Sequence, residues 1–218
     1  VVVAFLAIAS VLTVSSRAVG QDAASDLLNP AGLGDALNPV ATPTAPAEQP
    51  TRLATSRDVV SVSSQWSRQS APTGSQSVIA ITLSMTHPYH VNPNAERLPD
   101  DSMLIPTSVT FKDLPEGVTV GAVQFPEPHM VKVNYTGESE MIPAYEGDVT
   151  LYAPITIADS IPTGELIIKT AVRFQSCNDV QCLFPATTEV TTTLHVDAAA
   201  SAGMIDDDRA ALFANFDA

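Results

Sequence analysis

Two runs of alternating apolar and polar residues flank a short segment that carries two cysteines, and this arrangement restricts the fold more than any other feature. The runs are Leu166–Phe174 and Thr187–Val196, and both are rich in β-branched residues. Such alternation predicts strands with one buried face. The segment between them holds Cys177 and Cys182, the only two cysteines among 218 residues, with an Asn-Asp pair that favours a turn. The sequence therefore predicts a β-hairpin with the cysteine pair at its tip.

The same period of two recurs upstream, separated by Pro/Gly turns. Seven segments are predicted strands: Val59–Trp66, Ser77–Met85, Thr107–Lys112, Val118–Phe125, Asp148–Ile157, Leu166–Phe174 and Thr187–Val196. Many short strands with such turns favour an all-β, antiparallel β-sandwich. Roughly 140 residues are enough for one self-supporting core, so residues 57–197 are predicted to form a single domain.

The cysteine pair is poorly placed to staple this sandwich. A bond between Cys177 and Cys182 would close a loop of about six residues, which is worth only about 2 kcal/mol in the loop-entropy model. Short-loop bridges are also easily strained and reduced. We therefore predict that the two cysteines bond to each other and act as a redox pair. Two alternatives stay open, namely a structural bridge in a non-catalytic partner-binding module and a metal pair without its second Cys/His pair.

A copper-binding function is a further alternative. His87, His90, His129 and Met130 supply imidazole and thioether groups that, with the cysteines, suit Cu(I). These groups are scattered along the sequence, and residues three apart in a strand face opposite ways. We accordingly expect neither a metal nor another cofactor.

Several motifs together resemble one known family, the N-terminal periplasmic domain of the thiol:disulfide interchange protein DsbD. The most specific is Phe174–Pro185, which is similar to the active-site hairpin of that family. Four weaker matches lie upstream of it, in the same order as in that family: Pro88–Asn92, Leu114–Val118, Tyr135–Ile142 and Asp148–Ile157. The resemblance spans about Val59–Val196.

The resemblance implies an immunoglobulin-like topology and thiol–disulfide exchange. It implies that Cys182 attacks and Cys177 resolves the mixed disulfide. It also implies a cap loop that shields the cysteines, with Tyr135 as the shielding aromatic. The stretch between Phe125 and Asp148 shows no clear strand run and is interpreted as this loop. The expected surroundings of the active site are Met141, Tyr145, Phe174, Gln175, Phe184 and Pro185.

The resemblance also implies thioredoxin-like redox proteins as donor and acceptor, with a membrane electron transporter as a further partner. Electrons would have to be resupplied by a separate protein, because a single cysteine pair stores two electrons.

The ends of the chain indicate export. Val1–Val14 is apolar and too short to span a bilayer, and Ala18-Val19-Gly20 offers small residues for cleavage, so residues 1–20 are interpreted as a partial signal peptide. An uncleaved anchor is the alternative. Residues 21–56 are rich in Ala and Pro and are predicted to be a flexible linker that tethers the domain. Residues 198–218 are predicted to be an acidic, frayed tail, and no transmembrane span is expected in the mature, periplasmic or otherwise exported chain.

The charge balance excludes some partners. Ten basic against twenty-four acidic residues give a formal net charge of −14. This excess of negative charge argues against binding to nucleic acid or to anionic lipid.

Overall fold

The computed structural model describes residues 52–218, so the predicted signal peptide and most of the predicted linker lie outside the described residues. The strands are β1 (Val60–Trp66), β2 (Ser70–Ala71), β3 (Gln76–Met85), β4 (His90–Val91), β5 (Ser108–Lys112), β6 (Val118–Val120), β7 (His129–Val133), β8 (Glu140–Glu146), β9 (Asp148–Ile157), β10 (Gly164–Phe174), β11 (Ser176–Cys177) and β12 (Ala186–Val196). Three short 3-10 helices are η1 (Ser56–Asp58), η2 (Ala95–Arg97) and η3 (Asp207–Arg209). Nowhere in this part of the chain is a helix long and apolar enough to cross a membrane.

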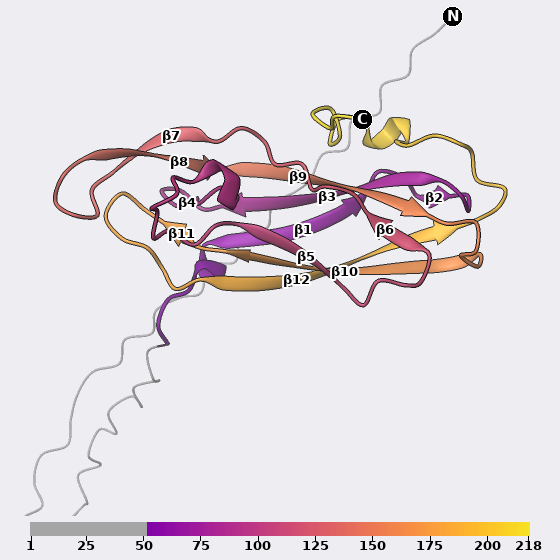
Figure 1. The fold of residues 1–218 in the computed structure, drawn as a ribbon, viewed down its shortest axis with the longest axis horizontal. Coiled ribbons are helices and arrows are strands. Elements are labelled where there is room, and N and C mark those ends of the chain that lie inside the picture. Colours follow the sequence, from indigo (N-terminus) through magenta and orange to yellow (C-terminus); the bar gives the residue numbers. More distant parts are fainter. Residues whose placement is uncertain (1–51) are drawn as a thin grey trace, which may run out of the picture. The chain divides into compact units, whose positions relative to one another are not determined.

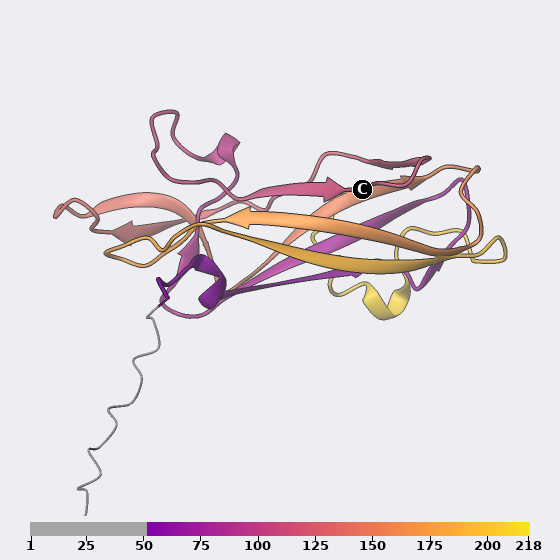
Figure 2. The same ribbon diagram turned by 90° about the horizontal axis from the view of Figure 1, so that it is seen from below.

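Two four-stranded sheets pack face to face and form the predicted β-sandwich (Figures 1 and 2). Their strand orders are β1-β3-β9-β6 and β2-β12-β10-β5. These orders match the A-B-E-D and G-F-C sheets of immunoglobulin domains, with β2 added to β12 as a parallel edge strand. The predicted all-β, immunoglobulin-like class is therefore confirmed.

The core lies between the two sheets and follows from the alternation in the sequence. On β9, Leu151, Ala153 and Ile155 are fully buried and face the other sheet, which contributes Ile168 and Leu194. Burying one such aliphatic side chain is worth about 1.5–3 kcal/mol, so the inward stripes stabilise the sandwich.

A third sheet, with the order β11-β4-β8-β7, extends one end of the sandwich (Figure 1). Its strands come from three different connections: β4 from β3–β5, β7 and β8 from β6–β9, and β11 from β10–β12. In an immunoglobulin-like topology these three connections emerge at the same end, so they can pair with one another. This end carries the cysteines.

The prediction of an irregular loop between Phe125 and Asp148 was wrong. Most of this stretch is the antiparallel β7–β8 hairpin, in register from His129↔Ala144 to Val133↔Glu140. Pro143 concealed the strand, because proline lacks the ladder N–H. It is tolerated because β4 pairs only with Tyr145 and Glu146, so β8 has a partner on one side alone at Pro143.

Each of the seven predicted strands overlaps an observed strand. The segment predicted as Val118–Phe125 is shorter, since β6 ends at Val120. Beyond it, Gly121 and Gln124 still bond to β9, at Pro154 and Tyr152. The turn before β6 forms as its sequence indicates. The amide of Val118 donates to the carbonyl of Pro115 at 3.1 Å, and Gly117 adopts a φ of 89°, which favours glycine.

The C-terminal segment is not frayed, contrary to the prediction. Phe213 is buried against Val78, Ala80 and Tyr152 on the outer face of β3 and β9. Those outward-facing apolar residues explain why β3 is buried on both faces.

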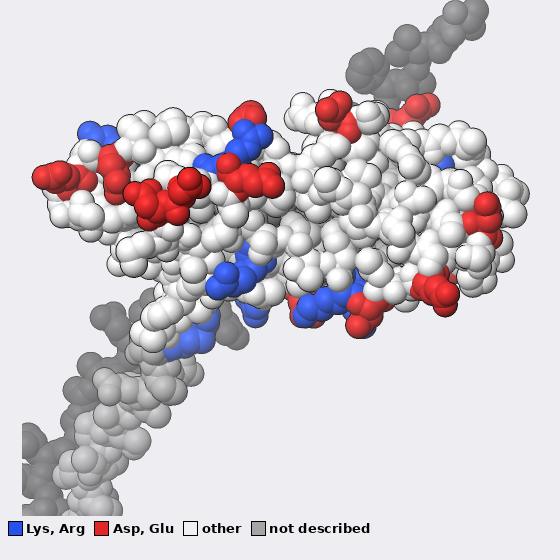
Figure 3. Space-filling model, in the orientation of Figure 1, with Lys and Arg blue, Asp and Glu red and all other residues white. Residues whose placement is uncertain are grey.

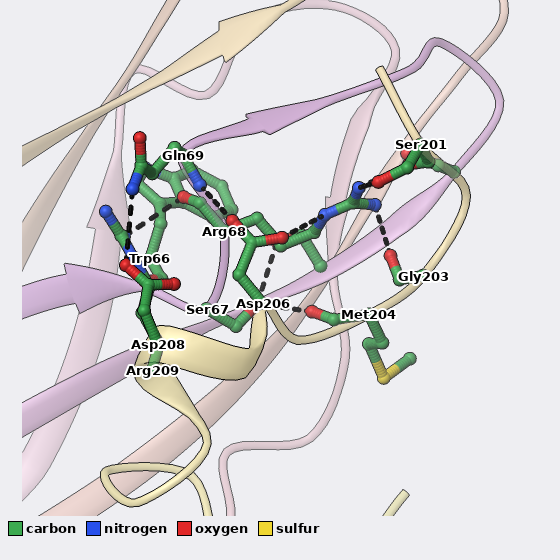
Figure 4. A network of polar contacts seen from close by, with 12 residues as sticks. Trp66, Ser67, Arg68, Gln69, Ser201, Gly203, Met204, Asp206, Asp208 and Arg209 are labelled. Carbon is green, nitrogen blue, oxygen red and sulfur yellow. Dashed lines mark hydrogen bonds and ion pairs between the residues drawn. The ribbon is translucent and has the colours of Figure 1, made fainter.

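Polar contacts hold the chain that leads to Phe213 (Figure 4). The buried guanidinium of Arg68 bonds the carbonyls of Ser201 and Gly203 and lies 3.6 Å from a carboxylate oxygen of Asp206. Asp206 also accepts the amide of Gln69 at 2.8 Å. Charge-assisted bonds of this kind are stronger than neutral ones, so this segment is an integral part of the fold.

Candidate redox site

Cys177 and Cys182 form a disulfide, as predicted, with 3.9 Å between their Cα atoms. Both lie in the connection between β10 and β12, whose last registered pair is Phe174↔Ala186. The predicted hairpin with a cysteine pair at its tip is therefore present.

The turn between the cysteines is built by Asn178. Its side-chain oxygen accepts the amides of Val180 and Gln181 at 3.0 Å each, and its own amide donates to the Gln181 carbonyl at 2.9 Å. This is the local turn chemistry for which asparagine is favoured. It brings the second arm back so that the amide of Leu183 donates to the carbonyl of Ser176 at 2.8 Å.

The two cysteines differ sharply in exposure. Cys177 belongs to β11, pairs with His90 of β4 and is fully buried. Cys182 lies on the outer arm and is exposed. A macromolecular partner can therefore approach Cys182 and not Cys177.

The outer arm is fixed by a residue that sequence analysis missed. Ser56 is fully buried, and its amide and hydroxyl both donate to the carbonyl of Phe184, at 2.8 and 2.9 Å. The same hydroxyl accepts the amide of Ser176 at 2.7 Å, so it links both arms of the hairpin. The fold thus includes the last residue of the predicted linker. No pattern marks a lone serine after a proline-rich stretch as structural.

Gln175 connects the hairpin to the chain that follows β4. Its side-chain nitrogen donates to the carbonyl of Leu183 at 3.3 Å. Its side-chain oxygen accepts the amide of Ile105 at 3.1 Å and the side-chain nitrogen of Asn92 at 3.4 Å. Gln175 therefore lies where the sequence placed it, beside the cysteines, and it positions both the outer arm and a neighbouring segment.

The β7–β8 hairpin reaches the cysteine turn through its own loop. The amide of Asn134 donates to the carbonyl of Asp179 at 2.6 Å, and the hydroxyl of Tyr135 lies 3.1 Å from Nε2 of His90. His90 is the strand partner of Cys177, so Tyr135 bonds the side chain next to the buried cysteine.

Burial determines the charge states of this pair. Desolvation raises the pKa of Tyr135 to about 12, and the carboxylates of Asp179 and Glu140 add to the rise. Desolvation lowers the pKa of His90, although Glu146 and Asp179 act in the opposite direction. A neutral imidazole and a neutral phenol therefore share the hydrogen bond at neutral pH.

The other expected site residues differ in their exposure. Phe184 and Pro185 are exposed on the outer arm next to Cys182. Phe174 is fully buried in the sandwich core, and Met141 is exposed on β8. Tyr145 is buried, and its hydroxyl donates to the carbonyl of Pro126 at 2.7 Å rather than to any residue of the cysteine hairpin.

Two of the three histidines considered for copper have other partners. Nε2 of His129 lies 2.7 Å from a carboxylate oxygen of Glu146, and His90 bonds Tyr135. Within residues 52–218 no group of three or more His, Cys, Asp or Glu side chains could hold a metal ion. This arrangement gives the copper alternative no support.

The fold and the hairpin define a class of protein: an immunoglobulin-like β-sandwich domain with one disulfide in the connection between its β10 and β12 strands. The family model described as "Thiol:disulfide interchange protein DsbD, N-terminal" matches residues 70–194. The chain therefore belongs to the DsbD N-terminal family.

Solved structures give more distant likenesses. The N-terminal periplasmic domain of ScsB from Proteus mirabilis has a TM-score of 0.43 and 10% identity over 72% of this chain and 54% of that one. A family 123 glycoside hydrolase from Clostridium perfringens has a TM-score of 0.32 and 8% identity over 63% and 27%. The GAE domain of GGA2p from Saccharomyces cerevisiae has a TM-score of 0.28 and 15% identity over 66% and 96%.

The match covers only about half the length of the ScsB domain. A search of curated proteins found no match to the chain. The assignment rests on the family model.

Proposed function

We propose that this domain relays reducing equivalents between a thioredoxin-like donor and protein disulfide substrates through Cys177 and Cys182. The observation that carries the proposal is the unequal exposure of the pair, with Cys177 fully buried and Cys182 exposed. An intermolecular disulfide can form only at a sulfur that a partner can reach, so this asymmetry supports Cys182 as the attacking residue.

The reaction takes two exchange steps. In the reduced domain the Cys182 thiolate attacks one sulfur of the partner disulfide, whose S–S bond breaks, and the other partner sulfur leaves and takes up a proton. The Cys177 thiolate then attacks the Cys182 sulfur in the mixed disulfide. The second partner sulfur leaves and is protonated, and Cys177–Cys182 is oxidised. Two electrons and two protons have moved to the partner.

The reverse sequence recharges the domain. A thiolate of a dithiol donor attacks the Cys182 sulfur of the oxidised pair, and Cys177 leaves as the thiolate and is protonated. The second donor thiolate then attacks the donor sulfur of the mixed disulfide and releases Cys182 reduced. The same exposed sulfur thus serves donor and acceptor, which supports thioredoxin-like proteins as partners in both directions. A membrane electron transporter is a further proposed partner.

Tyr135 is the proposed cap residue. Its contact with His90 and the bond from Asn134 to Asp179 are two links that hold the β7–β8 loop against the cysteine turn. Breaking two hydrogen bonds costs roughly 1–3 kcal/mol net, so the loop can open for a partner at a modest cost. This supports a role in shielding Cys177, the buried sulfur of the pair, until a partner arrives.

The proposed location is the periplasm or another exported compartment. The general setting of the DsbD N-terminal family supports it, as does the predicted signal peptide. The predicted linker would then tether the domain.

Trapping of mixed disulfides tests the assignment of roles. With Cys177→Ser, the remaining Cys182 thiol should form a persistent mixed disulfide with an oxidised thioredoxin-like protein, detected by non-reducing mass spectrometry. Cys182→Ser should trap little or none, because Cys177 is buried. Trapping by Cys182→Ser alone would reverse the roles.

The reduction potential separates a relay from a structural bridge. A relay pair should lie above about −300 mV, whereas structural disulfides lie below that value. Equilibration with glutathione buffers measures it, and a lower potential would favour a binding module with a structural hairpin bridge.

A further inference from the structure

A groove of about 420 Å³ opens beside the β7–β8 hairpin. One wall is the chain after η2, with Pro99, Met103 and Leu104, and the other is formed by Tyr135, Ile142 and Pro143. The lining is therefore mostly apolar. Met103 lies at its lip and is 97% exposed.

Both walls are attached to residues that flank the buried cysteine. Tyr135 bonds His90, the strand partner of Cys177. The chain after Leu104 is held by the amide of Ile105, which donates to the side chain of Gln175, two residues before Cys177. Two side-chain hydrogen bonds thus link the walls of the groove to residues beside Cys177.

The walls also have support of their own. Leu104 and Tyr135 pack against a small apolar cluster of β7 and β8, made of Val131, Val133, Ile142 and Ala144. A groove with packed walls is largely preformed and suits the binding of an apolar side chain.

The rim of the groove is acidic. Asp101 and Glu140 line it, and Asp100 and Glu138 are exposed next to them in sequence. Among the described residues that line the groove there is no lysine or arginine. Acidic side chains also gather over the end of the domain that carries β7 and β8 (Figure 3). A partner segment with positive charge would be attracted to this rim.

We propose that this groove is a specificity subsite for the redox partner. Its occupant is a segment of the partner polypeptide near the reacting disulfide, with a bulky apolar side chain and a lysine or arginine beside it. The apolar side chain enters between Met103 and Tyr135, and the cation meets Asp101 and Glu140. This inference rests on the proposed function, because it names the partner chemistry of the same site.

Competition among defined disulfides tests the proposal. Reduced protein is mixed with bis(2-hydroxyethyl) disulfide, or with a short peptide disulfide that has leucine and arginine beside each cysteine. Two further peptides carry glutamate for arginine or alanine for leucine. The leucine–arginine peptide should react roughly tenfold faster than the alanine form, the usual effect of one apolar pocket contact. It should react about threefold faster than the glutamate form, the size of an exposed ion pair, and high salt should remove this second preference.

Matched variants locate the effect. Met103→Glu should lower the ratio of the leucine–arginine rate to the alanine rate. Asp101→Lys combined with Glu140→Lys should invert the preference between arginine and glutamate. Met130→Glu is the control, since Met130 is also a methionine, lies on β7, is 55% exposed and does not line the groove. It should leave both ratios unchanged.

The outcomes separate the two proposals. Equal rates for all three peptides, with normal reduction of bis(2-hydroxyethyl) disulfide, would overturn the subsite and leave the exchange function standing. Failure to reduce any of the four disulfides would overturn the function itself. Self-association that Met103→Glu abolishes, measured by analytical ultracentrifugation, would assign the groove to a second copy of the chain and overturn the proposal.

Discussion

The hydroxyl of Tyr135 lies 3.1 Å from Nε2 of His90, and this contact joins the β7–β8 loop to the strand that pairs with Cys177. His90 is buried and Tyr135 is partly buried, and both are neutral at neutral pH because desolvation disfavours their charged forms. In the proposed cap this contact holds the loop closed, and substitution tests it directly.

Removing the Tyr135 side chain should uncover the Cys177 side of the disulfide. Tyr135→Ala should speed reduction of Cys177–Cys182 by dithiothreitol by roughly two- to tenfold, the effect of losing one hydrogen bond from a closed state. Tyr135→Phe keeps the ring and loses the hydroxyl, so it should fall between Ala and the natural protein. Stopped-flow measurement of the reduction rate provides the check, and an unchanged rate for Tyr135→Ala would remove this residue from the cap.

The stability of the domain should depend on pH through His90. Its folded pKa lies below the unfolded value near 6.5, so the unfolded chain binds more protons in the interval between the two pKa values. The stabilising contribution is therefore complete above about pH 6.5 and is lost as the pH falls below that value, with a slope of up to about 1.4 kcal/mol per pH unit.

Urea unfolding at pH 7.5 and 5.0 measures this dependence. His90→Gln cannot titrate and should show a smaller loss of stability between the two pH values than the natural protein. Glu146, Asp179 and His129 also act on the ring, and they are retained in the variant, so the difference between the two proteins isolates His90. Parallel pH profiles for both proteins would contradict the assignment.

Loss of the Ser56 hydroxyl should destabilise the hairpin. Ser56→Ala leaves the buried amide of Ser176 without its acceptor and removes one donor to Phe184, at a cost of about 1–3 kcal/mol in the free energy of unfolding. Ser61→Ala is the matched control, because Ser61 is an exposed serine of β1. Chemical denaturation of both variants gives the comparison, and equal stabilities would mean that the Ser56 contacts contribute nothing.

The packed C-terminal segment should contribute to stability and not to the exchange chemistry. Phe213→Ala should lower the free energy of unfolding by about 3–5 kcal/mol, as is typical of a large aromatic removed from a packed site. Asn215→Ala, an exposed neighbour, should have little effect. A stability loss below about 0.5 kcal/mol for Phe213→Ala would show that the segment is only loosely attached.

The two electrons stored by one cysteine pair should limit the reaction to a single turnover. The chain has two cysteines, so one reduced molecule should reduce one disulfide and then stop. Reduced protein mixed with excess peptide disulfide should release thiol equivalent to one bond per chain, and a reduced thioredoxin-like protein should restart the reaction. Continued turnover without a donor protein would refute the relay.

The fold was predictable where apolar and polar residues alternate along a strand, as in β9 and β10. One face of such a strand packs into the sandwich core, and this packing requires the alternation. The same logic failed for β8, where Pro143 breaks the pattern and the strand lies in an end sheet with sparse pairing. Packing of Phe213 could not be predicted, because it depends on an apolar outer patch at Val78 and Ala80 that belongs to a strand distant in sequence.

The redox pair was predictable because both cysteines lie in one short hairpin. The distant residues that hold this hairpin in place were not predictable. Ser56 and His90 reach the hairpin from segments far away in the sequence, and each acts through one side chain without a local motif. Long-range single contacts of this kind leave no periodic signal.

The chain enters the described domain at the hairpin rather than at the core. Thr55 forms a parallel bridge with Phe184, and Ser56 holds the same carbonyl with two hydrogen bonds. A mechanical pull on the chain before Arg52 would therefore load the arm of Cys182 before it loads β1. Tension on the N-terminal side of the domain would therefore act first on the arm that carries Cys182. The hydrogen bonds that attach the chain are made to Phe184 of that same arm.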